Sequence, residues 1–261
     1  RVGVEFQVNM ESPEYYQISP TVTGLDNGGF AVFWTSTEDE TYSTYDAYGQ
    51  LYDKLGAPVA GNFLIHQPIA GDQSNPSATN LPNGNLIVTW SQPDGGLGYY
   101  TGIYGKIIDQ ETGVTIIDEF QVNSHIYDVQ NGSETAVIIN NRGDFVVTWI
   151  SADDQDGDGW GTFGQLFDIN GSKIGGEFQL NTYTSLDQDH HDVTGIEVRV
   201  HAAAGVADNH QLSPQFLEDP HGQRDLLQWV ALVHMKTTLH CHHGRALQLP
   251  ANQSSSMACR G

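Results

Sequence analysis

Cysteine is nearly absent from this 261-residue chain, which has only two, both beyond position 240. Residues 1–240 therefore hold no disulfide and no cysteine-based zinc site. Basic residues are also scarce, with 10 Lys and Arg against 32 Asp and Glu and a formal net charge of −22. Such a chain repels nucleic acid and attracts cations, so we expect no nucleic-acid partner. No apolar run is long enough to span a bilayer, so we expect no membrane insertion.

The common catalytic signatures are also missing. The sequence contains no G-x-S-x-G, no H-E-x-x-H and no Gly-rich phosphate loop. Paired carboxylates of a glycosidase remain open, because 27 acidic residues in 1–195 make accidental pairs certain.

What the chain does contain is a repeat. The motif VEFQVN at 4–9 returns as GNFLIH at 61–66, DEFQVN at 118–123 and GEFQLN at 176–181. Runs that end in Trp (FAVFW, LIVTW, FVVTW) and an aromatic-Gly segment (YGQLYD, YGKIID, FGQLFD) recur with the same period of about 57 residues. Each Trp precedes the aromatic of its own copy by 14 residues. A fixed period of this length indicates a repeat architecture.

Each unit is expected to form four short strands. A Gly/Asn-rich turn before the Trp run is a strong hairpin signal. The Trp run itself is apolar at nearly every position, which indicates a strand buried on both faces. In EFQVN, Phe and Val alternate with Glu, Gln and Asn, which predicts a strand with one wet face.

The predicted fold class is therefore all-β, built from repeated antiparallel four-stranded sheets in a propeller-like arrangement. An immunoglobulin-like sandwich fits poorly, because it needs about 100 residues a domain. We expect about three full blades and a partial fourth in residues 1–194, with an irregular tail at 195–261. The predicted units span 10–66, 67–123 and 124–181, with a partial unit at 182–194. The tail is open to three interpretations: a degenerate blade, a disordered segment or a product of a shifted reading frame.

The stretch from 71 to 123, GDQSNPSATNLPNGNLIVTW…GIYGKIID…EFQVN, resembles tandem repeats of very large secreted bacterial surface proteins, including RTX-type calcium-dependent adhesins. The resemblance covers residues 1 to about 194. It implies a secreted, extracellular or cell-surface module that is not an enzyme. It also implies an association with Ca²⁺ and with further repeats of the same parent chain. Cell-surface or matrix glycans and proteins are the partners it suggests.

The loop at 150–162, ISADDQDGDGWGT, is the predicted calcium site. Alternating carboxylates and a Gly turn can wrap oxygen ligands around Ca²⁺, although the twelfth loop position is Gln165 where a complete site has Glu. The predicted ligands are Asp153, Asp154, Asp156 and Asp158. A solvated acidic hairpin is the alternative.

Aromatic residues of the equivalent loops are candidates for stacking on sugars or for capping sheet edges: Tyr42, Tyr45, Tyr99, Tyr100 and Trp160. The preferred hypothesis is a non-catalytic adhesion scaffold. A carbohydrate-binding propeller lectin is the first alternative, and a propeller glycoside hydrolase or lyase is the second.

Overall fold

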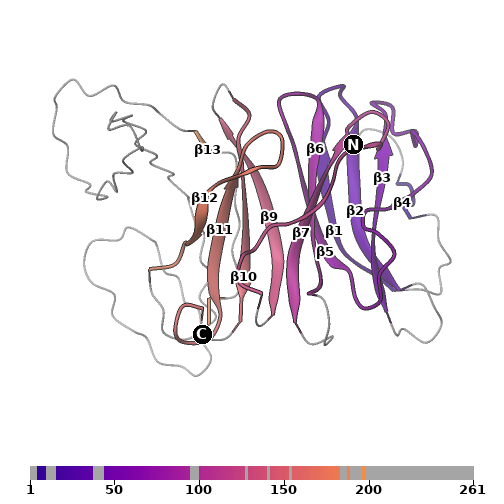
Figure 1. The fold of residues 1–261 in the computed structure, drawn as a ribbon. Coiled ribbons are helices and arrows are strands. Elements are labelled where there is room, and N and C mark those ends of the chain that lie inside the picture. Colours follow the sequence, from indigo (N-terminus) through magenta and orange to yellow (C-terminus); the bar gives the residue numbers. More distant parts are fainter. Residues whose placement is uncertain are drawn as a thin grey trace, which may run out of the picture.

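The computed structural model describes residues 5–9, 16–37, 44–94, 100–126, 129–139, 142–152, 155–182, 187–188 and 196–197. They form three antiparallel sheets that stand side by side (Figure 1). The first sheet contains β1 (Gln17–Gly24), β2 (Phe30–Thr37), β3 (Tyr45–Tyr52) and β4 (Phe63–Leu64). The second contains β5 (Ser74–Asn80), β6 (Asn85–Pro93), β7 (Thr101–Asp109) and β8 (Thr115–Gln121). The third contains β9 (Gln130–Ile139), β10 (Phe145–Ser151), β11 (Gly161–Phe167) and β12 (Lys173–Gln179), with β13 (Ile196–Glu197) parallel to β9.

Each sheet is a meander, in which strands that are consecutive in the chain are neighbours in space. The 14-residue spacing of the sequence is the cross-strand pairing of the second and third strands: Trp34 faces Tyr48, Trp90 faces Tyr104 and Trp149 faces Phe163. The predicted fold class is therefore confirmed for three blades. Among the described residues there is no helix, and so none that could cross a membrane.

Two kinds of turn hold the strands together. In the first hairpin, Asn27 Oδ1 accepts a hydrogen bond of 2.8 Å from the Gly29 amide, and Gly28 has a φ of 84° that favours glycine. After the third strand, an Asp carboxylate accepts backbone amides of the following turn in every sheet, from Asp53, Asp109 and Asp168. The repeated Asn, Gly and Asp residues thus fix the register of each unit.

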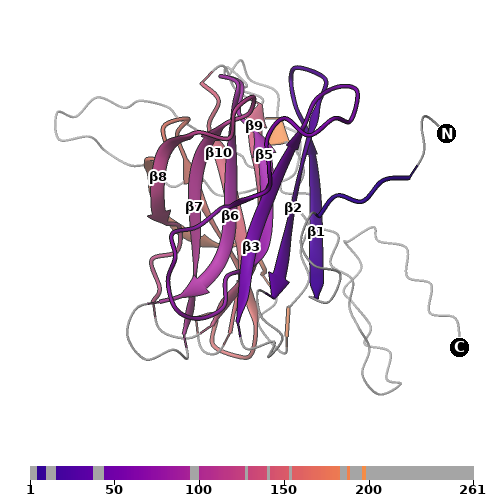
Figure 2. The same ribbon diagram turned by 90° about the vertical axis from the view of Figure 1, so that its right-hand side faces the viewer.

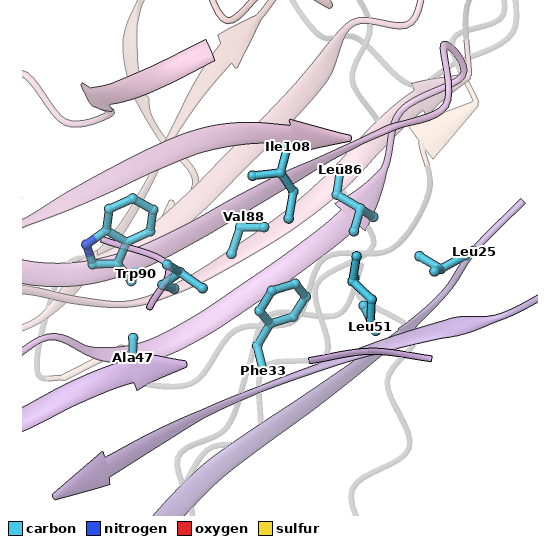
Figure 3. Close-up of a cluster of buried hydrophobic side chains, with 10 residues drawn as sticks. Leu25, Phe33, Ala47, Leu51, Leu86, Val88, Trp90 and Ile108 are labelled. Carbon is cyan, nitrogen blue, oxygen red and sulfur yellow. The ribbon is translucent and has the colours of Figure 1, made fainter. Parts of the chain in front are cut away.

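The core lies between the sheets. Figure 3 shows Phe33 and Leu51 of the first sheet opposite Leu86 and Val88 of the second, all buried. A second cluster joins the second sheet to the third and includes Ile87, the chain neighbour of Val88. Side chains that are adjacent on a strand point to opposite faces, so β6 is buried on both. The predicted sandwiching of the Trp strand is confirmed there.

An Asp-Gln pair, which we call the latch, ties the first and third sheets to the chain that follows them. The Gln73 amide donates to the Tyr45 carbonyl at 2.7 Å, and Asp72 Oδ1 accepts from the Tyr45 amide at 3.0 Å. The same residue pair after the third sheet, Asp187-Gln188, holds Trp160 through equivalent bonds of 3.3 and 2.7 Å. The recurring Asp-Gln dipeptide is thus a structural element.

One local expectation is wrong. The Asn of EFQVN was expected on a wet face, yet Asn123 is 2% exposed. Its Oδ1 accepts the Ile103 amide at 2.8 Å, and its Nδ2 donates to Gln130 Oε1 at 3.1 Å. A buried side-chain amide is stable when its groups are paired in this way. The predicted partial unit and tail lie outside the described residues, except for 182, 187–188 and 196–197.

Candidate functional site

The first strands of the three sheets lie next to one another, β1 against β5 and β5 against β9 (Figure 2). Where they meet, a pocket of about 260 Å³ opens. It is lined by all three strands, through Ser19, Pro20, Thr21, Asn75, Pro76, Gly132, Ser133 and Glu134. We call it the axial pocket. A cavity at the junction of repeated units is a usual place for a ligand site.

The backbone around the axial pocket is unusual in each blade. Ser19 and Asn75 have φ angles of 50° and 52°, and Gly132, at the same repeat position, has 59°. A register shift interrupts the pairing of each first strand there. Ser19 and Asn75 each precede a Pro, which disfavours the right-handed helical region for them. Non-glycine residues in the left-handed region cost about 1–3 kcal/mol each and concentrate at functional sites.

Side chains hold this strained geometry in place. Asn75 Nδ2 donates to Asn131 Oδ1 at 2.7 Å, across the boundary between the second and third sheets. The Asn75 amide donates to Thr35 Oγ1 of the first sheet at 3.1 Å. Ser91 Oγ donates to the same Asn131 oxygen at 3.1 Å. Asn75 therefore connects all three sheets beside the pocket.

The pocket contains one carboxylate among the residues that the structure describes. Glu134 is half-buried, and its Oε2 accepts from Ser77 Oγ at 3.4 Å. Glu134 pairs with Thr148, just as Ser77 pairs with Thr89 and Thr21 with Phe33, so these three residues share one repeat position. A hydroxyl occupies it in two blades and an acid only in the third. The carboxylate of Glu134 therefore breaks the symmetry of the repeat beside the pocket.

A larger hollow of about 400 Å³ opens beside Asp46 and His66. His66 Nε2 lies 3.2 Å from Asp46 Oδ1 and 3.4 Å from the Ala47 amide, and His66 Nδ1 lies 2.8 Å from the Gln67 carbonyl. His66 stands where Asn123 and Asn181 stand in the other units, and these accept the corresponding backbone amide. Both ring nitrogens are thus engaged in a structural connection of the repeat, and we do not assign a catalytic role to His66.

Further carboxylates are held in the same region of the other blades. Asp94 Oδ1 accepts from Tyr104 Oη at 2.6 Å and from Gln121 Nε2 at 2.8 Å. Burial raises the pKa of Asp94, against hydrogen bonds from Tyr104 and Asn123 that lower it. Burial, followed by the contact with Asp94, raises the pKa of Tyr104, so the phenol stays a donor. This pair clamps the loop to the sheet.

The predicted calcium ligands are only partly visible. Asp156 Oδ2 accepts from Asn181 Nδ2 at 3.0 Å, and Asp156 Oδ1 accepts the Asp158 amide at 3.2 Å. Asp153 and Asp154 lie outside the described residues. Within the described part of the chain, no three acidic, His or Cys side chains form a group that would hold a metal ion. The calcium site at 150–162 stays a prediction.

The structure describes three of the predicted aromatic ligands, Tyr45, Tyr100 and Trp160. Tyr45 and Trp160 occupy equivalent positions in the first and third sheets, where the latch holds their backbones. Tyr100 is 37% exposed beside the second sheet. None of these three lines either cavity. Tyr42 and Tyr99 lie outside the described residues.

Sequence reasoning missed the axial pocket. Its residues belong to first strands, whose Ser-Pro and Asn-Pro pairs read as ordinary strand starts. The available signal was the break in the repeat, where Thr21 and Ser77 are matched by Glu134 in the third unit.

Several solved structures with a similar fold are glycoside hydrolases. An α-L-arabinofuranosidase from Lactobacillus brevis aligns over 80% of this chain and 75% of its own, at 14% identity and a TM-score of 0.46. A family 117 glycoside hydrolase from Zobellia galactanivorans aligns over 65% and 58%, at 11% identity and 0.45. An endo-arabinase from Bacteroides thetaiotaomicron aligns over 62% and 61%, at 15% identity and 0.37. At these values neither substrate nor catalytic residues carry over to this chain. No protein-family model and no curated protein matches the sequence.

These comparisons correct several predictions. The resemblance to RTX-type adhesin repeats is contradicted, since the similar structures are glycoside hydrolases and no family model supports it. The same finding contradicts the non-catalytic adhesion scaffold, the prediction that the chain is not an enzyme, and its description as a calcium-binding adhesin of the RTX type. One fold hosts many unrelated functions, so the repeat motifs predicted the fold and did not discriminate between families. The extracellular location, the glycan partners and Ca²⁺ as a cofactor are tested by none of these observations.

Proposed function

We propose that this chain cleaves glycosidic bonds, with the sugar bound in the axial pocket. The observation that carries the proposal is the placement of Glu134 in a polar pocket whose other two repeat-equivalent positions are hydroxyls. The lining offers hydroxyl, amide and carboxylate groups, which match the hydroxyls of a sugar. The volume of about 260 Å³ lies near the lower end of ligand pockets, which suits a terminal sugar unit.

The chemistry assigns one role to Glu134. Hydrolysis adds water across the C–O bond: a carboxylic acid protonates the leaving oxygen, and a second carboxylate activates the water or attacks the sugar. Glu134 supplies one of these two carboxylates. Glu134 is the only acid in the described lining, so the second carboxylate is left to be assigned by mutagenesis of the acidic residues.

A glycosidase assay tests this assignment. We expect the purified chain to release nitrophenol from at least one member of a panel of nitrophenyl glycosides, or reducing ends from polysaccharides. Glu134→Gln keeps the side-chain shape and removes the acid, so it should lower kcat by about 10²–10⁴-fold. Glu111→Gln, an exposed change in the turn after β7, is the matched control and should leave kcat unchanged.

Two results would contradict the proposal. One is a chain that cleaves nothing in the panel, and the other is cleavage that Glu134→Gln leaves intact. The presence of a single carboxylate in the described lining favours a second candidate function, carbohydrate binding without cleavage. Binding measured by calorimetry, lost in Asn75→Ala and unaccompanied by product release, would select that function.

A further inference from the structure

The first sheet has one face against the second sheet and one face turned away from it. We infer that this outer face is a docking surface for one more blade of the same repeat, and that residues 5–9 are the fourth strand of that blade.

The register of the repeat defines the outer face. In the second sheet, Leu86, Val88 and Trp90 point toward the first sheet and are fully buried there. In the third sheet, the equivalent residues point toward the second: Phe145, Val147 and Trp149. The first sheet carries Phe30, Val32 and Trp34 at these positions. The outer face of the first sheet thus has the composition that two observed interfaces use.

A group of three aromatic rings shows how the next blade sits. Between the second and third sheets, Phe145 and Phe167 stack at 5.2 Å, and Phe120 of the preceding EFQVN motif lies 5.5 Å from Phe167 with a tilt of 48°. The outer face repeats this group, with Phe30 and Tyr52 stacked at 4.8 Å.

Phe6 completes the group on the outer face. It lies 5.7 Å from Tyr52 with a tilt of 54° and belongs to the first EFQVN motif. Tyr52 Oη also donates to the Val8 carbonyl at 3.0 Å. Residues 5–9 therefore hold the place, relative to the first sheet, that the fourth strand of the second sheet holds relative to the third.

Among the described residues the outer face is covered only in part, since Trp34 and Tyr52 are each 3% exposed while other side chains on it are open. Val22 of β1 is 68% exposed and Phe6 is 51% exposed. The equivalent of Val22 in the second sheet, Ala78, packs against the core between the sheets. In every described unit the first three strands precede the fourth in the chain. The occupant is accordingly a set of three strands equivalent to β5, β6 and β7.

An extended chain tests the inference. A copy of residues 67–118, which contains β5 to β7, is placed directly before Glu5, so that the repeat runs on in register. A repeat stack gains stability with each interface. We expect a single unfolding transition and a Tm raised by at least about 4 °C. A second extended chain, made with residues 124–176, should show the same rise in Tm. It serves as a check in case the copy of residues 67–118 packs poorly.

Val22→Asp tests whether a raised Tm comes from docking on the outer face or only from the greater length of the chain. In the parent chain the substitution should shift Tm by less than about 1 °C, because the side chain is exposed. In the extended chain it buries a charge and should remove most of the gain in Tm. Leu55→Asp, at an 84% exposed position in the turn after β3, is the control and should be silent in both chains.

Three outcomes would overturn the inference. The first is that neither extended chain melts in a single transition with a raised Tm. The second is that Val22→Asp changes Tm by the same amount in the parent chain and in the extended chain. The third is a parent chain that dimerises in a concentration-dependent way and loses the dimer with Val22→Asp, which would assign the face to a second copy.

Discussion

At the scale of the residue, each sheet has a carboxylate beside the end of its fourth strand, but the acid stands at different positions of the repeat. In two sheets it comes from the loop and faces a glycine, and in the first it occupies the position of that glycine. In the second sheet a Cβ on Gly102 would lie 2.6 Å from the Asp94 carboxylate, and in the third a Cβ on Gly161 would lie 2.7 Å from Asp156. The first sheet has Asp46 at this glycine position, and its carboxylate meets His66 directly. These two glycines are thus explained by space for a neighbouring acid, and not by a left-handed backbone.

Asp94 gives a prediction about pH. Because burial raises its folded pKa above the ordinary 3.8, the folded state binds more protons than the unfolded state between these two values. Stability should therefore fall as the pH rises through that window. In Asp94→Asn, the amide oxygen can still accept from Tyr104 and Gln121, and the ionisation is gone. We expect the variant to lose this pH-dependent decline and to be at least as stable as the parent at pH 7.

Urea unfolding from pH 3.5 to pH 7 measures the difference. Glu111→Gln, which removes an exposed charge, corrects for the change in net charge. A curve for Asp94→Asn that runs parallel to that of the parent would show that the folded and unfolded states bind protons at this group equally.

At the scale of the element, β6 contributes side chains to two interfaces between sheets. Ile87 and Val88 are both 0% exposed but belong to different core clusters. Ile87→Ala should therefore cost about 2–5 kcal/mol of unfolding free energy, through lost burial and a cavity between the second and third sheets. Ile116→Ala on the outer strand β8, where the side chain is 50% exposed, should cost less than about 0.5 kcal/mol.

Urea denaturation with matched m-values checks this prediction. A cost for Ile87→Ala below that of Ile116→Ala would mean that the strand is not enclosed on both faces. A changed m-value would show instead that the sheets unfold separately.

The same strands show what the sequence could predict. The apolar run before each Trp predicted a buried strand, and the constant spacing of the motifs predicted a repeat, because these features depend on local pattern and period. The axial pocket depends on contacts between first strands about 57 residues apart, such as Asn75 with Asn131. The left-handed angle at Asn75 also left no mark in the sequence pattern, because Asn-Pro is compatible with several turns. The sequence therefore predicted the fold but not the axial pocket.

At the scale of the whole molecule, the sheets stack so that core contacts join the first to the second and the second to the third. Such an array behaves as a series of units coupled through interfaces. The interfaces are apolar, and the excess charge belongs to the repeats, since 27 of the 32 acidic residues lie in 1–195. The folded stack is thus held together against its own electrostatic repulsion.

This balance predicts a salt dependence. Folding brings the charges of a chain with a net charge of −22 closer together, so screening should stabilise the compact state. Raising NaCl from 0.1 to 1 M shortens the Debye length from about 10 to about 3 Å, and we expect Tm to rise. A variant with two exposed acids neutralised, Glu111→Gln with Asp118→Asn, should show a smaller rise.

Thermal scans in NaCl and in CaCl2 at equal ionic strength separate screening from binding. An equal rise in both salts reports screening alone, whereas a saturable extra rise with CaCl2 reports a bound ion and would support the calcium site predicted at 150–162. A Tm that stays flat or falls with NaCl would contradict the prediction, because it would mean that attraction between the few basic residues and the acids outweighs the repulsion.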